Sequence, residues 1–154
     1  ILSVEQTEKA GLFTICFEGE SLTEFGKFIH KFKDDAICKH DLQVIVNALQ
    51  RMLQTSGFIE RMFRPEGKIK DNVCALPIEA SKLRLYCLRL SDSILIVGNG
   101  GRKTTATYNI DKELNGYVIS LQKLDELIKV ALRSGDVTIE ETVITGINDK
   151  EFEL

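Results

Sequence analysis

The chain has 154 residues, of which 44% are hydrophobic and 28% are charged. This length and composition predict one globular domain with its own hydrophobic core. No run of about 18 apolar residues is present, so no membrane-spanning helix is predicted. The first residues also lack the basic head and apolar stretch of a secretory signal. We therefore expect a cytoplasmic protein without membrane contact.

The distribution of charge limits the functions that fit. The net charge of −3 lacks the basic excess that dedicated nucleic-acid-binding proteins usually carry. Residues 60–103 hold nine lysines and arginines against five acidic residues, whereas residues 136–154 hold six acidic residues and one lysine. A nucleic-acid function would therefore depend on a local basic surface in the middle of the chain.

The cysteines and histidines show no spacing typical of a metal or catalytic site. No Cys-x-x-Cys pair occurs among Cys16, Cys38, Cys74 and Cys87. Three of these four cysteines lie in apolar, strand-like runs, which favours reduced, buried thiols. Both histidines, His30 and His40, lack a partner at ligand or triad spacing. We predict no metal and no cofactor.

The first half of the chain predicts one strand followed by two helices. Alternating apolar residues favour a strand over Gly11–Gly19. Ser21–Glu24 has the sequence of a capping box with Ser21 as the N-cap, and the helix after it carries an apolar stripe that ends at Phe32. A second amphipathic helix is predicted from about residue 41 to a stop at Gly57.

Two apolar runs, Leu83–Leu90 and Ile94–Val97, predict a central β-hairpin around a short polar turn. Because strand side chains alternate, Arg84 and Tyr86 share one face of the first strand. The second run is apolar throughout, as expected for a central strand that is covered on both faces. It leads into Gly98–Gly101 and then into two cations.

The glycine-rich end of this hairpin is predicted to form a site. Glycines free the backbone to turn or to approach a ligand, and Arg102 and Lys103 follow them at once. Neither GK[ST] nor GxGxxG accompanies these glycines, so a nucleotide-binding enzyme is not predicted.

The remaining elements complete an α+β domain. Val73–Ile78 is strand-like, with Pro77 marking an edge or an end. A third helix is predicted over about Leu114–Arg133, and a strand over Val137–Ile144. The order β-α-α-β-β-β-α-β favours a mostly antiparallel sheet.

These features resemble the RelE/ParE superfamily of bacterial type II toxin–antitoxin systems. KLRLYCLRL is similar to the family's central strand with its arginine, and ILIVGNGGRKTT to the next strand and its basic exit. The resemblance covers residues 12–108 as the family core; residues 109–154 extend it, as in longer subfamilies from Bacteroidetes. It implies one RelE-like domain over residues 1–154: a two-helix hairpin packed on a mostly antiparallel sheet, with an additional C-terminal helix and short strands.

The ribonuclease branch of this family implies a toxin that cuts mRNA in the ribosomal A site, where the 2′-hydroxyl attacks its own phosphate without a metal. Such a site needs cations to stabilise the phosphorane and a group to move a proton. By position, the resemblance implies catalytic roles for Arg84, Arg102 and Tyr108, with Arg84 as the phosphate clamp. The residues expected to contact RNA are Lys68, Lys70, Lys82 and Lys103. The implied partners are a cognate antitoxin that covers the basic face, the ribosome and mRNA.

An alternative function stays open. The strand over Cys74–Ile78 lacks the lysines that the family's nucleases carry there, and the acidic balance weakens docking on ribosomal RNA. The alternative is a non-catalytic member of the fold that binds a protein, either a gyrase-inhibiting toxin or a degenerate interaction module. In the catalytic interpretation, Arg84→Ala abolishes toxicity without unfolding the protein. Otherwise Arg84 is an ordinary strand position that faces solvent.

Overall fold

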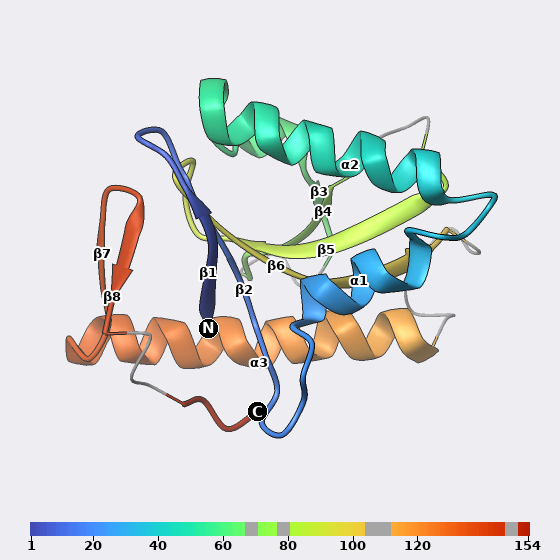
Figure 1. The fold of residues 1–154 in the computed structure, drawn as a ribbon. Helices are drawn as coiled ribbons and strands as arrows, with labels where there is room; N and C mark the ends of the chain where they lie inside the picture. Colours follow the sequence, from blue (N-terminus) through green and yellow to red (C-terminus); the bar gives the residue numbers. More distant parts are fainter. Residues whose placement is uncertain (67–70, 77–80, 104–111, 147–150) are drawn as a thin grey trace.

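The computed structural model describes residues 1–66, 71–76, 81–103, 112–146 and 151–154. Within these residues the chain is an α+β protein with a mixed sheet between helical layers (Figure 1). The strands of the large sheet are β1 (Leu2–Gln6), β2 (Gly11–Thr14), β3 (Arg64–Pro65), β4 (Val73–Leu76), β5 (Leu83–Arg89) and β6 (Ile94–Arg102). The helices are α1 (Glu24–Phe32), α2 (Lys39–Arg51) and α3 (Lys112–Ser134), with a π-helical turn η1 (Met52–Ser56) and a 3₁₀ turn η2 (Glu60–Met62). A separate hairpin is formed by β7 (Thr138–Glu140) and β8 (Val143–Thr145).

The six-stranded sheet has the order β1-β2-β6-β5-β4-β3. Only β2 and β6 pair in parallel among the described strands, which confirms a mostly antiparallel sheet with the β5–β6 hairpin at its centre. The strand predicted over Gly11–Gly19 is wrong beyond Thr14. β2 ends at Thr14, whose hydroxyl donates to the Val97 carbonyl of β6 over 2.8 Å and accepts from the Phe25 amide of α1.

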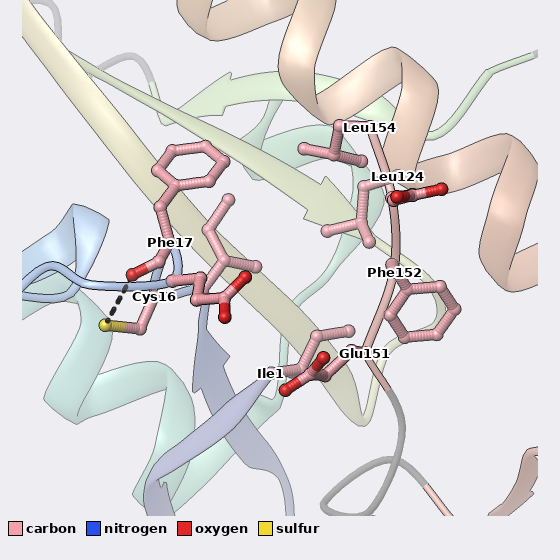
Figure 2. Close-up of a pocket in the computed structure, with 10 residues that line it drawn as sticks. Ile1, Cys16, Phe17, Leu124, Glu151, Phe152 and Leu154 are labelled. Atoms are coloured by element: carbon pink, nitrogen blue, oxygen red, sulfur yellow. Dashed lines mark hydrogen bonds between the residues drawn. The ribbon is translucent and has the colours of Figure 1, made fainter.

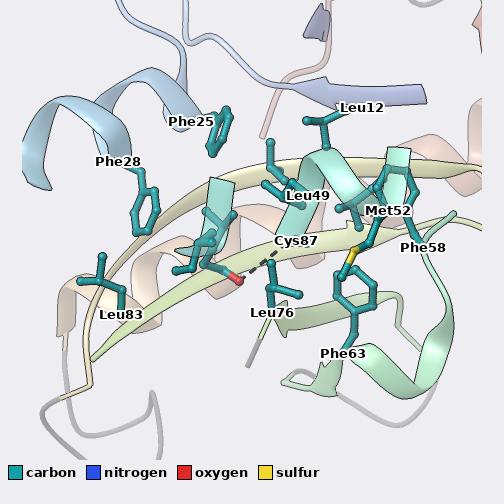
Figure 3. Packing of buried hydrophobic residues seen from close by; sticks show 14 of the residues in the cluster. Leu12, Phe25, Phe28, Leu49, Met52, Phe58, Phe63, Leu76, Leu83 and Cys87 are labelled. Atoms are coloured by element: carbon teal, nitrogen blue, oxygen red, sulfur yellow. Dashed lines mark hydrogen bonds between the residues drawn. The ribbon is translucent and has the colours of Figure 1, made fainter. Parts of the chain in front are cut away.

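The sheet separates two hydrophobic cores. On one face, Phe28 of α1 and Leu49 of α2 pack in the same cluster as Leu83 of β5 (Figure 3). On the other face, Leu121 of α3 packs in a cluster with Tyr86 of β5. Leu83 and Tyr86 therefore face opposite cores, which confirms the alternation predicted for this strand.

The glycine-rich segment is part of β6 rather than a loop at its end. β6 continues through the glycines to Arg102, so the predicted glycine-rich lip is wrong. These glycines permit close packing: a Cβ on Gly100 would lie 1.9 Å from the Arg84 carbonyl oxygen, and one on Gly101 would lie 2.8 Å from a Leu114 methyl group. Side chains at these positions would push β5 and α3 away from β6.

The start of α1 differs from the predicted capping box. Thr23, not Ser21, is the N-cap, and its hydroxyl accepts the Gly26 amide over 2.9 Å. The second helix begins at Lys39, two residues before the predicted start, and its π-helical extension ends at Gly57 as predicted. Gly57 has a φ of 71°, a conformation that glycine adopts without steric cost.

The third helix was predicted correctly, but the segment after it was not. Val137–Ile144 is not one strand, because the chain reverses at Glu141, which has a φ of 51°, to form the β7–β8 hairpin. The hairpin approaches β2 so closely that a Cβ on Gly11 would lie 2.2 Å from the Thr142 carbonyl oxygen. None of the helices in the described part of the chain has the length and apolar character that a membrane crossing requires.

Candidate functional site

Arg84 is on β5 but is almost completely buried. Its residue surface is 6% exposed, and it shares the strand face of Tyr86, the face that α3 covers. The alternative prediction that Arg84 is an ordinary solvent-facing strand position is therefore wrong. The sequence showed which residues shared its face, but not that a helix would pack on that face.

The Arg84 guanidinium lies beside a buried carboxylate. Its Nη1 is 3.7 Å from Oε1 of Glu66, which is also 6% exposed, and Arg64 Nε lies 3.7 Å from the same oxygen. Burial raises the pKa of the Glu66 carboxyl above its ordinary value, and the charges of Arg84 and Arg64 oppose this shift. Arg84 thus compensates an internal negative charge, so binding a phosphate would require it to leave Glu66 uncompensated.

Three other predicted cations meet at one end of the β5–β6 hairpin. We call Lys82, Arg102 and Lys103 the basic end. The Lys103 amide donates to the Lys82 carbonyl over 2.8 Å, and Arg102 stands opposite Leu83 in the strand register. Lys82 and Arg102 are exposed and Lys103 is half-buried. The fold therefore brings together cations that are 20 positions apart in the sequence.

The loop between α1 and α2, together with the first turn of α2, places acidic groups beside the basic end. The amides of Cys38 and Ile37 donate to the Asp35 carboxylate and, with a further contribution from Arg102, lower its pKa. The Lys82 amide donates to Asp41 Oδ2 over 2.9 Å. The basic end is thus a mixed surface in which nearby carboxylates offset part of the positive charge.

A further polar cluster joins α1 to α3 beyond the end of β2. Lys31 Nζ donates to the Gly100 carbonyl over 2.9 Å and to the Tyr117 hydroxyl over 3.1 Å, and it lies 3.4 Å from Glu113 Oε1. We missed this cluster in the sequence because Lys31 and Tyr117 are 86 positions apart and neither belongs to a motif. Its partners are side chains and backbone of the fold itself, so it holds the two helical layers together at this edge.

The remaining predicted site residues, Tyr108, Lys68 and Lys70, lie outside the described residues. The structure brings together Lys82, Arg102 and Lys103, which are exposed or half-buried, whereas the neighbouring Arg84 is buried. Within residues 1–66, 71–76, 81–103, 112–146 and 151–154, no group of three or more His, Cys, Asp or Glu side chains is arranged to hold a metal ion.

Comparison with known proteins found no match: no family model, no curated protein and no solved structure is significantly similar to this chain. Its function must therefore be inferred from its own residues.

Proposed function

We propose that this chain is a toxin component with a RelE/ParE-like fold that acts by binding a protein rather than by cleaving RNA. The observation that carries the proposal is the burial of Arg84 beneath α3. A phosphate clamp must reach its ligand, whereas Arg84 is 6% exposed and faces the Glu66 carboxylate. The central arginine is better suited to stabilising the fold than to catalysis.

The arrangement of elements supports the family assignment within this proposal. A helical hairpin, α1–α2, follows β2, and the meander β4–β5–β6 returns the chain to the edge of β2. The helix α3 then adds a layer that the minimal family fold lacks. Leu114, Val118 and Leu121 of α3 are buried in the core on the Arg84 face, so this extension covers the face that a nuclease would present to RNA.

The basic end is the surface we assign to the protein partner. Its two exposed cations, Lys82 and Arg102, suit an acidic segment of a cognate antitoxin or of a cellular target. Charges at the rim of an interface speed association and select the partner more than they add affinity. The mixed charge around the basic end favours such selective protein contact over general attraction to RNA phosphates.

The second candidate is the ribosome-dependent mRNA endonuclease, metal-independent and driven by the 2′-hydroxyl. One observation favours it: Lys82, Arg102 and Lys103 lie together at the end of the hairpin. Three adjacent cations suit a phosphate backbone as well as an acidic peptide. The two candidates differ in what happens to cellular mRNA.

Controlled expression in a bacterial host, with new mRNA ends mapped, tests the proposal. We expect growth arrest with intact mRNA, and loss of arrest when Lys82→Glu, Arg102→Glu and Lys103→Glu are combined. The matched control combines Lys9→Glu, Lys123→Glu and Arg133→Glu, which reverse three exposed cations elsewhere and should leave arrest unchanged. Codon-phased cuts in translated mRNA would establish the nuclease instead, and absence of arrest by the unaltered chain would contradict both toxin functions.

A further inference from the structure

A pocket of about 500 Å³ lies between the loop after β2 and residues 151–154 (Figure 2). Phe17 and Cys16 lie on one side, and the segment from Glu151 to Leu154 lies on the other, together with Leu124 of α3. The volume falls within the range of about 300 to 1,000 Å³ that is typical of small-molecule sites. Its lining includes no residue of the basic end, and neither Arg84 nor Glu66.

The lining of this pocket combines apolar walls with carboxylates. The apolar side chains include Phe17, Leu124 and Phe152, and the carboxylates come from Glu18, Glu151 and Glu153. None of the described lining residues is lysine or arginine. The side chains of the described lining residues therefore contribute three carboxylates and no cation.

One described lysine, Lys27, lies close to Phe17 but is paired with carboxylates outside the pocket lining. Its Nζ lies 5.5 Å from the centroid of the Phe17 ring and pairs with Glu20 and Glu24. The contact shows that a cation can lie near the Phe17 ring. An apolar pocket with three carboxylates and an aromatic wall is complementary to a ligand that has both an apolar body and a positive charge.

We infer that this pocket binds a small organic cation with an apolar body. The apolar part would pack against Phe17, Leu124 and Phe152, and the charge would lie near Glu18 and Glu151. Burial of the apolar part supplies affinity, whereas the carboxylates select a cation over a neutral or anionic molecule of the same shape. This binding activity is separate from the proposed contact at the basic end.

Cys16 provides a reporter at the wall of the pocket, where its thiol contacts the backbone carbonyls of Glu20 and Leu22. It is the half-buried cysteine of the chain, whereas Cys38, Cys74 and Cys87 are buried. Burial raises the pKa of all three buried thiols, that of Cys74 to about 12, and so reduces their reactive thiolate fraction. N-ethylmaleimide should therefore modify Cys16 first, and a ligand in the pocket should slow this reaction.

The experiment measures the rate of Cys16 modification in the full chain, with octyltrimethylammonium, octanol or octanoate added. We expect saturable protection by octyltrimethylammonium, weaker protection by octanol and none by octanoate. Glu18→Gln and Glu151→Gln should each weaken binding of the cation about two- to fivefold, as expected for a partly exposed ion pair. Glu60→Gln, at an exposed glutamate of η2 outside the lining, is the matched control and should leave binding unchanged.

Either of two results would overturn the inference. One is no protection of Cys16 by octyltrimethylammonium at any concentration at which the chain stays folded by circular dichroism. The other is equal protection by octyltrimethylammonium and octanol, with no effect of the two glutamine variants, because the carboxylates would then select nothing. Neither result bears on the growth-arrest experiment, which concerns a different surface.

Discussion

A buried ion pair requires the Arg84 side chain to stay beside Glu66, whereas a catalytic role requires it to be accessible to RNA. The arginine compensates the Glu66 carboxylate at 3.7 Å, and both residues are only 6% exposed. Removing one member of a buried pair leaves the other charge uncompensated and costs about 3 to 5 kcal/mol. Arg84→Ala should therefore lose stability as well as any activity, contrary to the expectation that it would leave the fold intact.

The pH dependence of stability tests the state of Glu66. A carboxyl whose pKa is raised on folding binds more protons in the folded chain, so its contribution to the free energy of unfolding falls as pH rises from the ordinary pKa to the raised one. The quantity to follow is the difference in the free energy of unfolding between the unaltered chain and the Glu66→Gln variant. We expect this difference to fall as the pH rises above about 4.5. Each tenfold difference in proton affinity corresponds to about 1.4 kcal/mol. Urea unfolding from pH 4 to pH 8 measures this difference.

The control for this experiment is the same comparison in an Arg84→Met background. Without the guanidinium, the pKa of Glu66 should rise further, and the fall in stability should extend to higher pH. A difference between the unaltered chain and Glu66→Gln that stays constant with pH would show that the Glu66 pKa is not raised on folding.

At the scale of elements, α3 is fixed to the sheet by a buried polar contact as well as by its apolar stripe. Asp125 is fully buried, and its carboxylate accepts the backbone amide of Asn72 over 3.2 Å and the side-chain amide of Asn72 over 2.9 Å. Lys129 Nζ lies 2.8 Å from the same carboxylate. Gln122 also donates to Asp71, so adjacent residues before β4 bind two successive turns of α3.

Asp125→Ala should lower the free energy of unfolding by about 3 kcal/mol, because it removes a buried carboxylate and leaves two half-buried Asn72 donors without their acceptor. Glu126→Ala, at the exposed next position of the same helix, should change it by less than about 0.5 kcal/mol. Urea unfolding of the two variants measures both values. A similar small effect of both substitutions would show that water replaces the Asp125 contact.

At the scale of the whole molecule, one sheet serves two hydrophobic cores. β5 and β6 contribute alternate side chains to the core under α1 and α2 and to the core under α3. If either α3 or the α1–α2 layer undocked, one face of β5 and β6 would be exposed to solvent. We therefore expect the described part of the chain to unfold as one cooperative unit.

Native-state hydrogen exchange tests this cooperativity. Amides of α3 and of β5 should exchange with the same free energy of opening, and Leu121→Ala should lower both by about 3 kcal/mol, because Leu121 is 1% exposed. Val130→Ala, at an exposed position of α3, is the matched control and should lower neither. Exchange of α3 through a smaller opening would show that the helix undocks alone and uncovers Arg84, which would revive the nuclease interpretation.

The sequence by itself determined the local elements of this protein. Apolar periodicity predicted all three helices in the described residues and the central hairpin, including the opposite faces of Leu83 and Tyr86. It failed at β1, whose five residues are all exposed and which is ordered by pairing with β2. Periodicity reports which residues share a face, and β1 buries no face that could produce a pattern.

Only the tertiary structure decided what the candidate residues contact. It placed Arg84 under α3 beside Glu66, gave the glycines of β6 a packing role, and joined Lys31 to Tyr117 across the edge of the sheet. Each outcome depends on a partner far away in the sequence. Burial and charge compensation are properties of such pairs, so a reading of single segments showed where Arg84 lies on its strand but not what it does there.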